Sequence, residues 1–400
     1  MALMYQAPGV YIEEVSSGAR PIEAVGTSTA GFVGTAPNIK AFVNEAVAIN
    51  NWGEFCAKFV QDGGKSTPLS NAVYGFFLNG GRRCFVVNIG SSDSLVAVPG
   101  KRTGLQCLEV LDDCPIIAAP GLNTVESYDA ILSHCEKLKN RVAILDPQQG
   151  ITDIQQLVKV AAVRRPRGAS DAAPTDVAAG AKPRQSDQGY GAFYFCEILA
   201  MDPLEGKVVT MYPSGHIAGV WARTDGRRGV HKAPANETLR GAVGVCYQIT
   251  QEEQAVLNPE SVNCIRFFPR EGVRIWGGRT LASSSSEFRY ISVRRTFIMI
   301  CESIKRSTRW IVFEPNDRSL WKSIIRDVSA FLTLLWRQGA LMGLTPEAAF
   351  FVKCDEETNP PEVINAGQVV IEVGIAPVKP AEFVVFRIAQ KEEEARAEQS

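Results

Sequence analysis

Four short runs of almost uninterrupted apolar residues constrain the fold of this chain more than any other feature of its sequence. The runs are 84–89 (CFVVNI), 115–119 (PIIAA), 142–145 (VAIL) and 192–199 (AFYFCEIL). A strand that is apolar on both faces has to be covered on both faces, and helices do this in largely parallel sheets. The chain from about 80 to 200 therefore predicts an α/β domain with a parallel sheet.

The segments between these runs have the periodicity of helices. In 124–139 apolar residues recur every three or four positions, which predicts an amphipathic helix. In 152–163 Thr152 and Gln155 have the spacing of a capping box, so we expect a helix to begin there. Residues 164–189 are rich in Ala, Pro, Gly and charged side chains, and they predict an exposed, mobile loop.

From about residue 245 the pattern changes and predicts an α+β unit. Residues 317–338 carry one wide apolar stripe, and Gly339 stands where a C-terminal glycine cap ends a helix. Pro346 has the place of a first helical residue in a second, short helix. In 369–375 apolar residues alternate as they do on one face of a strand.

Both ends of the chain carry strand-like runs that have no obvious local partner. These residues are Val10, Tyr11 and Ile12 near the N-terminus and Phe383, Val384, Val385 and Phe386 near the C-terminus. Because neither run can bury itself locally, each needs a sheet elsewhere, in this molecule or in another. A charged tail, KEEEARAEQS, follows the second run and is expected to be solvated.

The charge of the chain is nearly balanced but unevenly distributed. The 400 residues, enough for two or three domains, hold 42 Lys and Arg against 43 Asp and Glu. This argues against a nucleic-acid-binding protein, which usually has a basic excess. Residues 262–310 hold ten Lys and Arg against three acidic residues, whereas 346–400 hold five against eleven.

Opposite charge blocks of this kind are expected to meet each other, within a subunit or between copies. The candidate electrostatic contacts are Arg294, Arg295, Lys305, Arg306, Lys322 and Arg326. No apolar run reaches the ~20 residues of a membrane helix, so no membrane insertion is expected. The N-terminal residues lack a basic region followed by an apolar one, so no secretory signal is expected either.

The residues that could carry chemistry form only weak patterns. None of the ten Cys lies in a C-x-x-C motif, and with three His in the chain we expect buried, reduced thiols, no metal and no cofactor. Gly63-Gly64-Lys65-Ser66 resembles part of a phosphate-binding loop, but Phe59 stands where the motif needs glycine, and the preceding 52–60 has a helical pattern.

Two patterns suggest a serine hydrolase. Ser28, in Gly26-Thr27-Ser28-Thr29-Ala30, resembles the nucleophile segment of subtilisin-like proteases, but no His precedes it as that chain order requires. Ser214, His216 and Asp225 are a conceivable triad without an evident oxyanion hole, and they remain the alternative function, a hydrolase.

Several longer motifs resemble those of contractile tail sheath proteins, the family of contractile phage tails, R-type pyocins and extracellular contractile injection systems. They extend over nearly the whole chain and include Pro8-Gly9-Val10-Tyr11, Asn79-Gly80-Gly81, Pro213-Ser214-Gly215-His216, Lys232-Ala233-Pro234-Ala235-Asn236, Trp276-Gly277, Val293-Arg294-Arg295, Phe313-Glu314-Pro315-Asn316-Asp317 and Pro380-Ala381-Glu382-Phe383. Ser283-Ser284-Ser285-Ser286 departs from the family pattern, as does the acidic tail after Gln390.

The resemblance implies a structural subunit and not an enzyme. Such subunits polymerise as stacked hexameric rings, or a six-start helix, around an inner tube, and contraction drives the tube through a target envelope. The implied partners are further copies, the tube protein, and baseplate and tail-terminator or cap proteins. The protein would be made in the cytoplasm of the producing bacterium and become part of a phage tail or an injection particle.

The resemblance also implies a division of the chain. An N-terminal arm, 1–20, precedes an outer three-layer α/β domain, 21–244, of subtilisin-like but non-catalytic topology. An inner α+β domain, 245–376, and a C-terminal arm and charged tail, 377–400, follow. The two arms would cross to neighbouring subunits and complete their C-terminal β-sheets.

Overall fold

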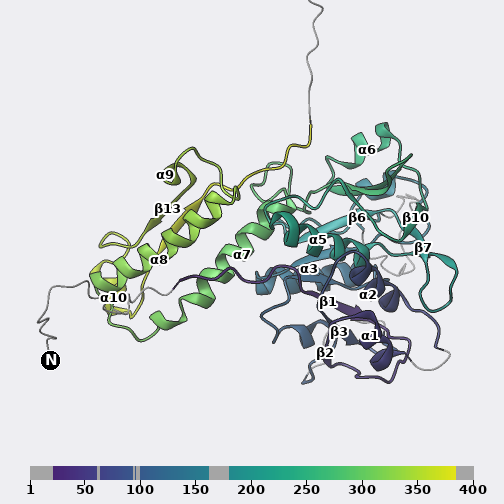
Figure 1. Ribbon diagram of the computed structural model, residues 1–400, viewed down its shortest axis with the longest axis horizontal. Coiled ribbons are helices and arrows are strands. Elements are labelled where there is room, and N and C mark those ends of the chain that lie inside the picture. Colours follow the sequence, from purple (N-terminus) through teal and green to yellow (C-terminus); the bar gives the residue numbers. More distant parts are fainter. Residues whose placement is uncertain (1–20, 61–63, 93–94, 96–99, 162–179, 384–400) are drawn as a thin grey trace, which may run out of the picture.

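The computed structural model describes residues 21–60, 64–92, 95, 100–161 and 180–383 (Figure 1). The predicted N-terminal arm residues Val10, Tyr11 and Ile12, the C-terminal 384–386 and most of the predicted loop 164–189 lie outside these ranges. Within the described residues no helix is long and apolar enough to cross a membrane.

The larger part of the molecule is built on a nine-stranded sheet. In spatial order its strands are β2 (Ala46–Ile49), β3 (Cys84–Asn88), β1 (Ala30–Gly34), β4 (Ile116–Ala118), β5 (Val142–Leu145), β6 (Gly191–Phe195), β11 (Val262–Phe268), β12 (Gly272–Trp276) and β9 (Glu237–Thr238). The pairings from β3 through β11 are parallel, and β1, β3, β4, β5 and β6 are buried throughout. The prediction of a mostly parallel, doubly covered sheet is confirmed.

The apolar run 192–199 forms two strands instead of the single one expected. It is shared between β6 and β7 (Ile198–Met201), and β7 pairs with β8 (Val208–Met211) and β10 (Ala242–Val245) in a separate three-stranded sheet. Two contacts redirect the chain here: the Cys196 thiol donates to the Tyr247 carbonyl, and the Cys246 amide donates to the Glu197 carbonyl. These partners lie 51 and 49 residues further on, so the local hydrophobic pattern does not reveal them.

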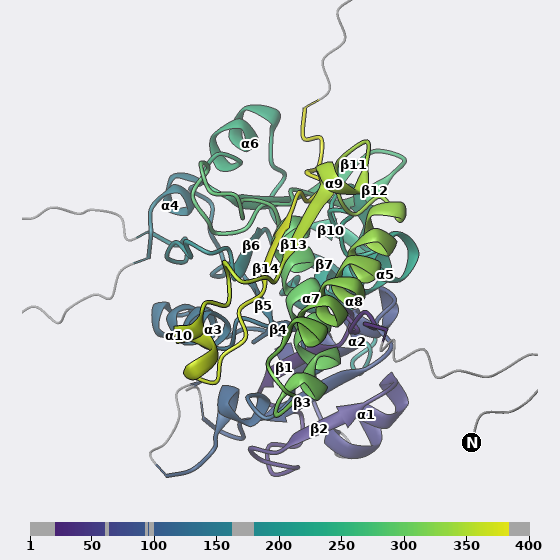
Figure 2. The same cartoon turned by 90° about the vertical axis from the view of Figure 1, so that its left-hand side faces the viewer.

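Helices cover both faces of the large sheet, as Figures 1 and 2 show. They include α1 (Trp52–Phe59), α2 (Pro68–Leu78), α3 (Val125–Leu138), α5 (Ser214–Arg228) and α6 (Gln251–Leu257). α2 and α5 pack closely because α5 presents glycines to the α2 backbone: a Cβ at Gly215 would lie 2.2 Å from the Ala72 carbonyl oxygen. This close approach buries the first eleven residues of α5.

The prediction of a helix over 152–163 is wrong in its extent and its cap. Only α4 (Gln155–Val158) is helical, and its N-cap Ile154 makes no side-chain capping bond. The Gln155 amide donates instead to the Asp153 carboxylate, and Val160 pairs in an isolated parallel bridge with Lys182. The chain becomes extended after α4 because this bridge to a distant segment competes successfully with a weak helical pattern.

The smaller part of the molecule surrounds one long helix. Its elements are α7 (Ile291–Ser307), α8 (Arg318–Arg337), α9 (Pro346–Ala349), β13 (Phe350–Lys353), α10 (Pro361–Asn365) and β14 (Glu372–Ile375). α8 begins as predicted, where the Asp317 side chain accepts from the Leu320 amide, and Gly339 follows with a φ of +77°. The strand expected over 369–375 is shorter and consists of β14 alone.

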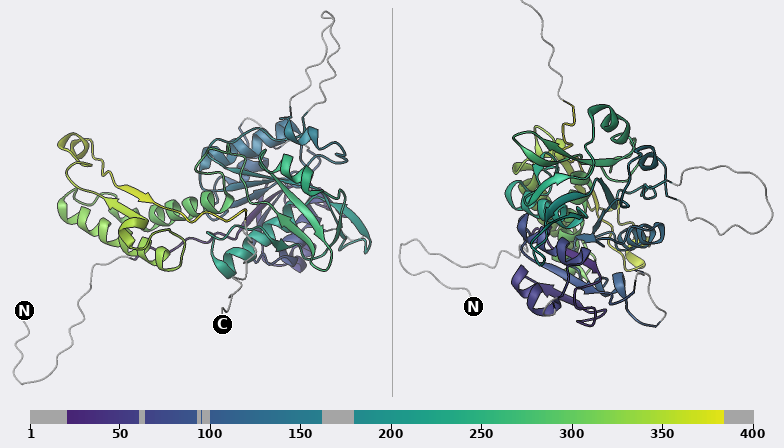
Figure 3. Two further views of the ribbon diagram at one scale, coloured as in Figure 1. Left: turned by 90° about the horizontal axis from the view of Figure 1, so that it is seen from above. Right: turned by 90° about the vertical axis from the view of Figure 1, so that its right-hand side faces the viewer.

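The described residues form two hydrophobic cores. The first surrounds the nine-stranded sheet, and the second surrounds the apolar stripe of α8, with β13 and β14 packed against it. α7 runs from one part to the other (Figures 1 and 3). β11 and β12 belong to the large sheet, although they lie within the range 245–376 that the sequence assigned to the inner domain.

Candidate functional site

The three residues of the possible hydrolase triad lie on α5, but each has a different partner. Ser214 donates through its amide and its hydroxyl to the two carboxylate oxygens of Asp146, at 2.8 and 2.6 Å. Asp146 follows β5 and supplies the N-terminal cap of α5, where Pro213 offers no side-chain acceptor. Burial raises the pKa of Asp146 to about 7, although its hydrogen bonds from Ser214 act in the opposite direction.

His216 is buried and faces Gly75 of α2, where a Cβ would lie 2.3 Å from the imidazole Nδ1. This Nδ1 has no hydrogen-bond partner among the described residues, and burial lowers the pKa of His216 to about 4. The Asp225 carboxylate accepts two bonds from Arg295, at 2.9 and 2.6 Å, and one from the Thr27 hydroxyl. The geometry therefore gives the hydrolase alternative no support.

The subtilisin-like segment around Ser28 and the segment that resembles a phosphate-binding loop both form ordinary structural contacts or elements. Thr27, next to Ser28, donates to Asp225 and lies just before β1. The segment before Gly64-Lys65 is the helix α1, as its pattern predicted, and not the strand that a phosphate-binding loop needs. Gly63 lies outside the described residues.

Arg295 forms the central contact of the junction between α5, α7 and the segment before β1. Its guanidinium pairs with Asp225, donates to the Thr27 carbonyl oxygen at 2.9 Å, and lies 4.7 Å from the ring centroid of Trp221. The side chains of Arg295 and Asp225 are only 3% and 4% exposed. Arg295 therefore holds elements of one subunit together.

Arg294 is also buried. Its guanidinium lies 3.7 Å from the ring centroid of Phe288, and it donates to the Tyr190 hydroxyl at 3.0 Å. Because Arg294 and Arg295 are enclosed within the subunit, neither can serve as the exposed electrostatic contact expected from the sequence. Sequence reasoning missed this because the hydrogen-bond partners, Tyr190 for Arg294 and Asp225 for Arg295, lie about 100 and 70 residues away.

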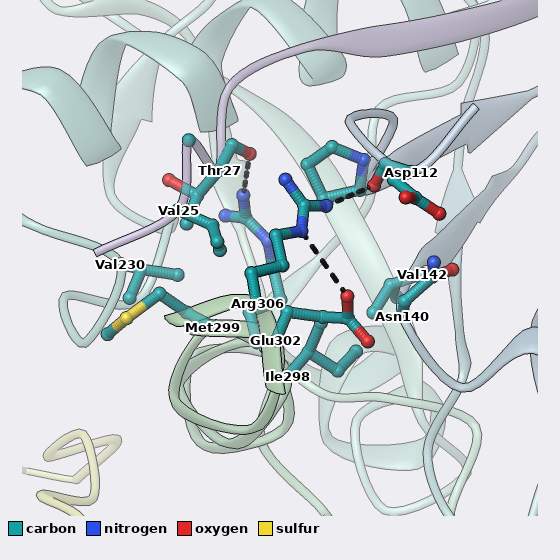
Figure 4. Close-up of a pocket in the computed structure, with 13 residues that line it drawn as sticks. Val25, Thr27, Asp112, Asn140, Val142, Val230, Ile298, Met299, Glu302 and Arg306 are labelled. Atoms are coloured by element: carbon teal, nitrogen blue, oxygen red, sulfur yellow. Dashed lines mark hydrogen bonds and ion pairs between the residues drawn. The ribbon is translucent and has the colours of Figure 1, made fainter. Parts of the chain in front are cut away.

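A small cavity lies beside this junction (Figure 4). It is lined by residues that include Val25, Thr27, Asn140, Met299 and Arg306, and it leaves about 20 Å³, room for about one water molecule. Arg306 crosses its edge, donating to the Asp112 carbonyl oxygen at 2.5 Å and lying 3.6 Å from the Glu302 carboxylate. A space of this size does not accommodate a substrate.

The remaining candidate cations are more exposed. Lys305 pairs with Glu302 at 3.2 Å, Arg326 pairs with Asp327 at 2.9 Å, and Lys322 lies exposed on α8. One pair does join the basic block 262–310 to the acidic block 346–400. Arg279 holds Glu382 through two hydrogen bonds, at 2.8 and 2.6 Å, and both side chains are largely buried.

The cysteine positions fit the expectation of buried thiols in part. Seven of the ten thiols are buried and Cys56 is half-buried, whereas Cys246 and Cys301 are exposed. The described part of the chain contains no group of three or more His, Cys, Asp or Glu side chains that could hold a metal ion.

The small sheet beside α8 has only two strands among the described residues. In the described residues it consists of β13 and β14 alone, paired antiparallel from Phe350↔Ile375 to Lys353↔Glu372. A two-stranded sheet is marginal by itself in water. Phe351, more than half exposed on β13, and the fully exposed Leu344 in the preceding loop add apolar surface nearby.

Comparison with known families shows which family this fold belongs to. The model of the phage tail sheath protein central domain matches residues 114–281, and that of the phage tail sheath C-terminal domain matches residues 283–391. These ranges hold 168 and 109 of the 400 residues, together well over half of the chain. The chain belongs to the phage tail sheath family.

Two sheath proteins of phages illustrate the relationship. The tail sheath protein of Escherichia phage P2 is 23% identical over 409 aligned positions, covering 95% of this chain and 94% of that protein. The tail sheath protein of Salmonella phage ViI is 30% identical over 278 positions, covering 66% of this sheath protein. The match spans only 41% of the length of that relative.

Solved structures match over nearly the full length. The sheath complex of an extracellular contractile injection system, PVC, in its contracted state gives a TM-score of 0.75 at 28% identity. That match covers 98% of this sheath protein and 99% of the other chain. A chain in the baseplate of the anti-feeding prophage gives a TM-score of 0.73 at 29% identity, covering 97% and 100%. The mixed α/β fold is therefore that of sheath subunits.

Proposed function

We propose that this sheath protein polymerises as stacked hexameric rings, or a six-start helix, around an inner tube and contracts to drive the tube through a target envelope. The observation that carries the proposal is the full-length structural match to a sheath complex in its contracted state, with almost no residues of either chain left over. The energy of contraction would be stored in a metastable assembly.

We also propose that the arms, 1–20 and 377–400, tether each subunit to its neighbours. The two-stranded sheet of β13 and β14 is the acceptor that we favour, since it is small and has unpaired edges within the described residues. Strands added from neighbours would complete it through backbone hydrogen bonds. Val10, Tyr11, Ile12 and Phe383–Phe386 remain the residues that we expect to form those strands.

The division into an outer and an inner domain remains part of the proposal, with a changed boundary. Because β11 and β12 lie in the large sheet and most of the second core comes from residues 299–354, we place the boundary near residue 290 in place of 245. The subtilisin-like topology of the outer domain is proposed from its central parallel strands and its helices on both faces.

The inner part would face the tube through exposed cations. Lys305, Lys322 and Arg326 remain candidates for such contacts, while Arg306 is partly engaged within the subunit. Contacts of this kind weaken with salt, so the extended assembly should be salt-sensitive. The further partners that we propose are baseplate and cap proteins at the two ends of the assembled sheath. We also propose that the sheath protein is synthesised in the cytoplasm of the producing bacterium.

Sedimentation of the full chain and of a variant lacking residues 1–15 tests the tether. Incubated with its tube protein, the full chain should pellet as long assemblies, and the truncated chain should stay in the supernatant as small species. Urea unfolding of both chains is the control: equal unfolding transitions would show that the deletion acts on assembly and not on the fold of the subunit. Truncated chains that still pelleted as contractile sheaths would refute the role of the N-terminal arm.

A further inference from the structure

The segment 21–29, which we call the strap, enters the described structure alongside α7 (Figure 1). It forms neither helix nor strand, so its backbone groups need partners outside the regular elements. The Val25 amide donates to the Ser303 hydroxyl of α7 at 3.0 Å. The Glu23 amide donates to the Ser307 hydroxyl, on the next turn of α7, at 3.3 Å. Two serine side chains of one helix therefore hold the backbone of the strap.

The spacing of these two contacts fits a chain laid along a helix. Glu23 and Val25 are two residues apart, about 6.6 Å in an extended chain. Ser303 and Ser307 are four residues apart, about 6 Å along the axis of α7. The earlier strap residue meets the later serine, so the strap runs antiparallel to α7. The two periods agree to within about 1 Å, which lets consecutive contacts form without displacing the helix.

The strap is fastened to both parts of the molecule. Near its start, Ile22 is buried in the second hydrophobic core. Near its end, the Thr27 carbonyl oxygen accepts from Arg295 at 2.9 Å, and the Thr27 hydroxyl donates to Asp225 of α5 at 2.7 Å. The residues that precede the strap are those of the proposed N-terminal arm, so this is the place where the arm joins the folded subunit.

The two serines are not explained by the stability of α7. Serine inside a helix is less favourable than alanine. The hydroxyl of the buried Ser303 also donates to the Met299 carbonyl oxygen at 2.6 Å, a type of bond that slightly destabilises helices. What serine adds, and alanine cannot supply, is an oxygen that accepts a hydrogen bond from the strap.

The end of α7 is itself held from the side of the large sheet. Arg306 donates to the Asp112 carbonyl oxygen at 2.5 Å, and Arg309, just after α7, lies 3.5 Å from the Asp112 carboxylate. Asp112 lies in the loop that precedes β4. A pull on the strap would therefore be passed through α7 to the larger part of the molecule.

We propose that Ser303 and Ser307 are positioning residues of the N-terminal arm. By holding the strap against α7 they fix the point at which residues 1–20 leave the subunit, and so the neighbour that the arm reaches. This inference rests on the tethering function proposed above and adds the residues that direct the tether. An arm with a loose base would have more residues to order each time it binds a neighbour, and assembly would weaken.

Hydrogen exchange of the full-length protein, without tube protein and read by mass spectrometry on peptides that cover the strap, tests the anchor. In S303A/S307A the strap should exchange about fivefold faster than in the wild type, the factor that corresponds to about 1 kcal/mol from one hydrogen bond. Urea unfolding should stay close to that of the wild type, because alanine favours the helix. If the double variant does not fold, S307A, at a half-buried position, is measured in the same way. Unchanged exchange would overturn the proposal.

Sedimentation with tube protein tests the positioning role. The pelleted fraction of S303A/S307A should fall about tenfold, because the freed strap has to be ordered again at every tether. S307T keeps the accepting oxygen and should pellet like the wild type. Faster exchange combined with full pelleting would overturn the positioning role and leave the arm as a tether, which the deletion of residues 1–15 tests separately.

The matched control is S319A/S323A on α8. It removes two hydroxyls at the same four-residue spacing, where the Ser323 hydroxyl donates to the Ser319 carbonyl oxygen at 3.1 Å, within the helix. Exchange of the strap and pelleting should both remain those of the wild type. Equal effects of the two double variants would overturn the proposal, because they would show that the contacts of Ser303 and Ser307 with the strap are not the cause.

Discussion

Replacing Asp225 by Asn should destabilise the subunit more than any surface substitution, because it breaks an enclosed ion pair. The substitution keeps the shape of the side chain but removes the charge that faces the Arg295 guanidinium, whose side chain is 3% exposed. Two charge-assisted hydrogen bonds are lost or weakened, while Arg295 keeps only the Thr27 carbonyl oxygen and the Trp221 ring as partners. Leaving one partner of a buried pair uncompensated typically costs about 3–5 kcal/mol in the free energy of unfolding.

Urea unfolding followed by tryptophan fluorescence measures this loss, with Trp221 as a reporter beside the pair. Two controls show whether the loss comes from the unpaired buried charge. Lys137→Gln removes an exposed pair with Glu109 and should cost less than about 1 kcal/mol. The double variant Asp225→Leu with Arg295→Met, which removes both charges together, should be more stable than Asp225→Asn. A loss for Asp225→Asn no larger than that for Lys137→Gln would refute the idea that this pair fastens α7 to α5.

Further predictions concern acid stability and the packing of α5. The pKa values of the buried His134 and His216 are lowered to about 4. Below pH 6.5 the unfolded chain therefore binds protons that the folded protein does not, and the free energy of unfolding falls as the pH falls toward 4. The loss is about 3 kcal/mol for each histidine. Asp146, with its pKa raised to about 7, acts in the opposite direction, because its contribution is present below its unfolded pKa and is lost as the pH rises through 7. Urea titrations should therefore show a smaller difference in the free energy of unfolding between pH 5 and pH 7 in His216→Gln than in the wild type. An unchanged difference would contradict the lowered pKa of His216. Gly219→Ala places a Cβ 2.4 Å from the Phe76 carbonyl oxygen and should cost about 1–3 kcal/mol by thermal or urea unfolding. Gly226→Ala, on the same helix with no atom within 4 Å of the new Cβ, should instead stabilise the protein by about 0.5–1 kcal/mol, and equal losses in both variants would show that the close approach to α2 is not the cause.

The parts of the fold that follow from local pattern were predicted from the sequence. Residues 142–145 form β5 as expected, and α8 begins after Asp317 and is followed by Gly339. Continuous apolar runs and helical stripes report the burial of an element directly, so no knowledge of its partner is needed. The long motifs that resemble sheath proteins likewise depend only on the order of residues.

The parts that depend on distant partners were missed. The run 192–199 divides because residues 246 and 247 capture its middle, and the helix expected over 152–163 ends where Val160 meets Lys182. Arg294 and Arg295 look like surface cations in the sequence, since arginine is rarely buried unless it is paired. Their burial becomes visible only when Tyr190 and Asp225 are placed beside them.

The assembly itself is tested most directly by negative-stain electron microscopy of the purified full-length protein incubated with its tube protein. The account predicts long, transversely striated tubes with sixfold symmetry in end-on views, in a longer, narrower and a shorter, wider form. Discrete 43.5 kDa particles that never form tubes under these conditions would contradict the proposal that this chain is a contractile sheath subunit.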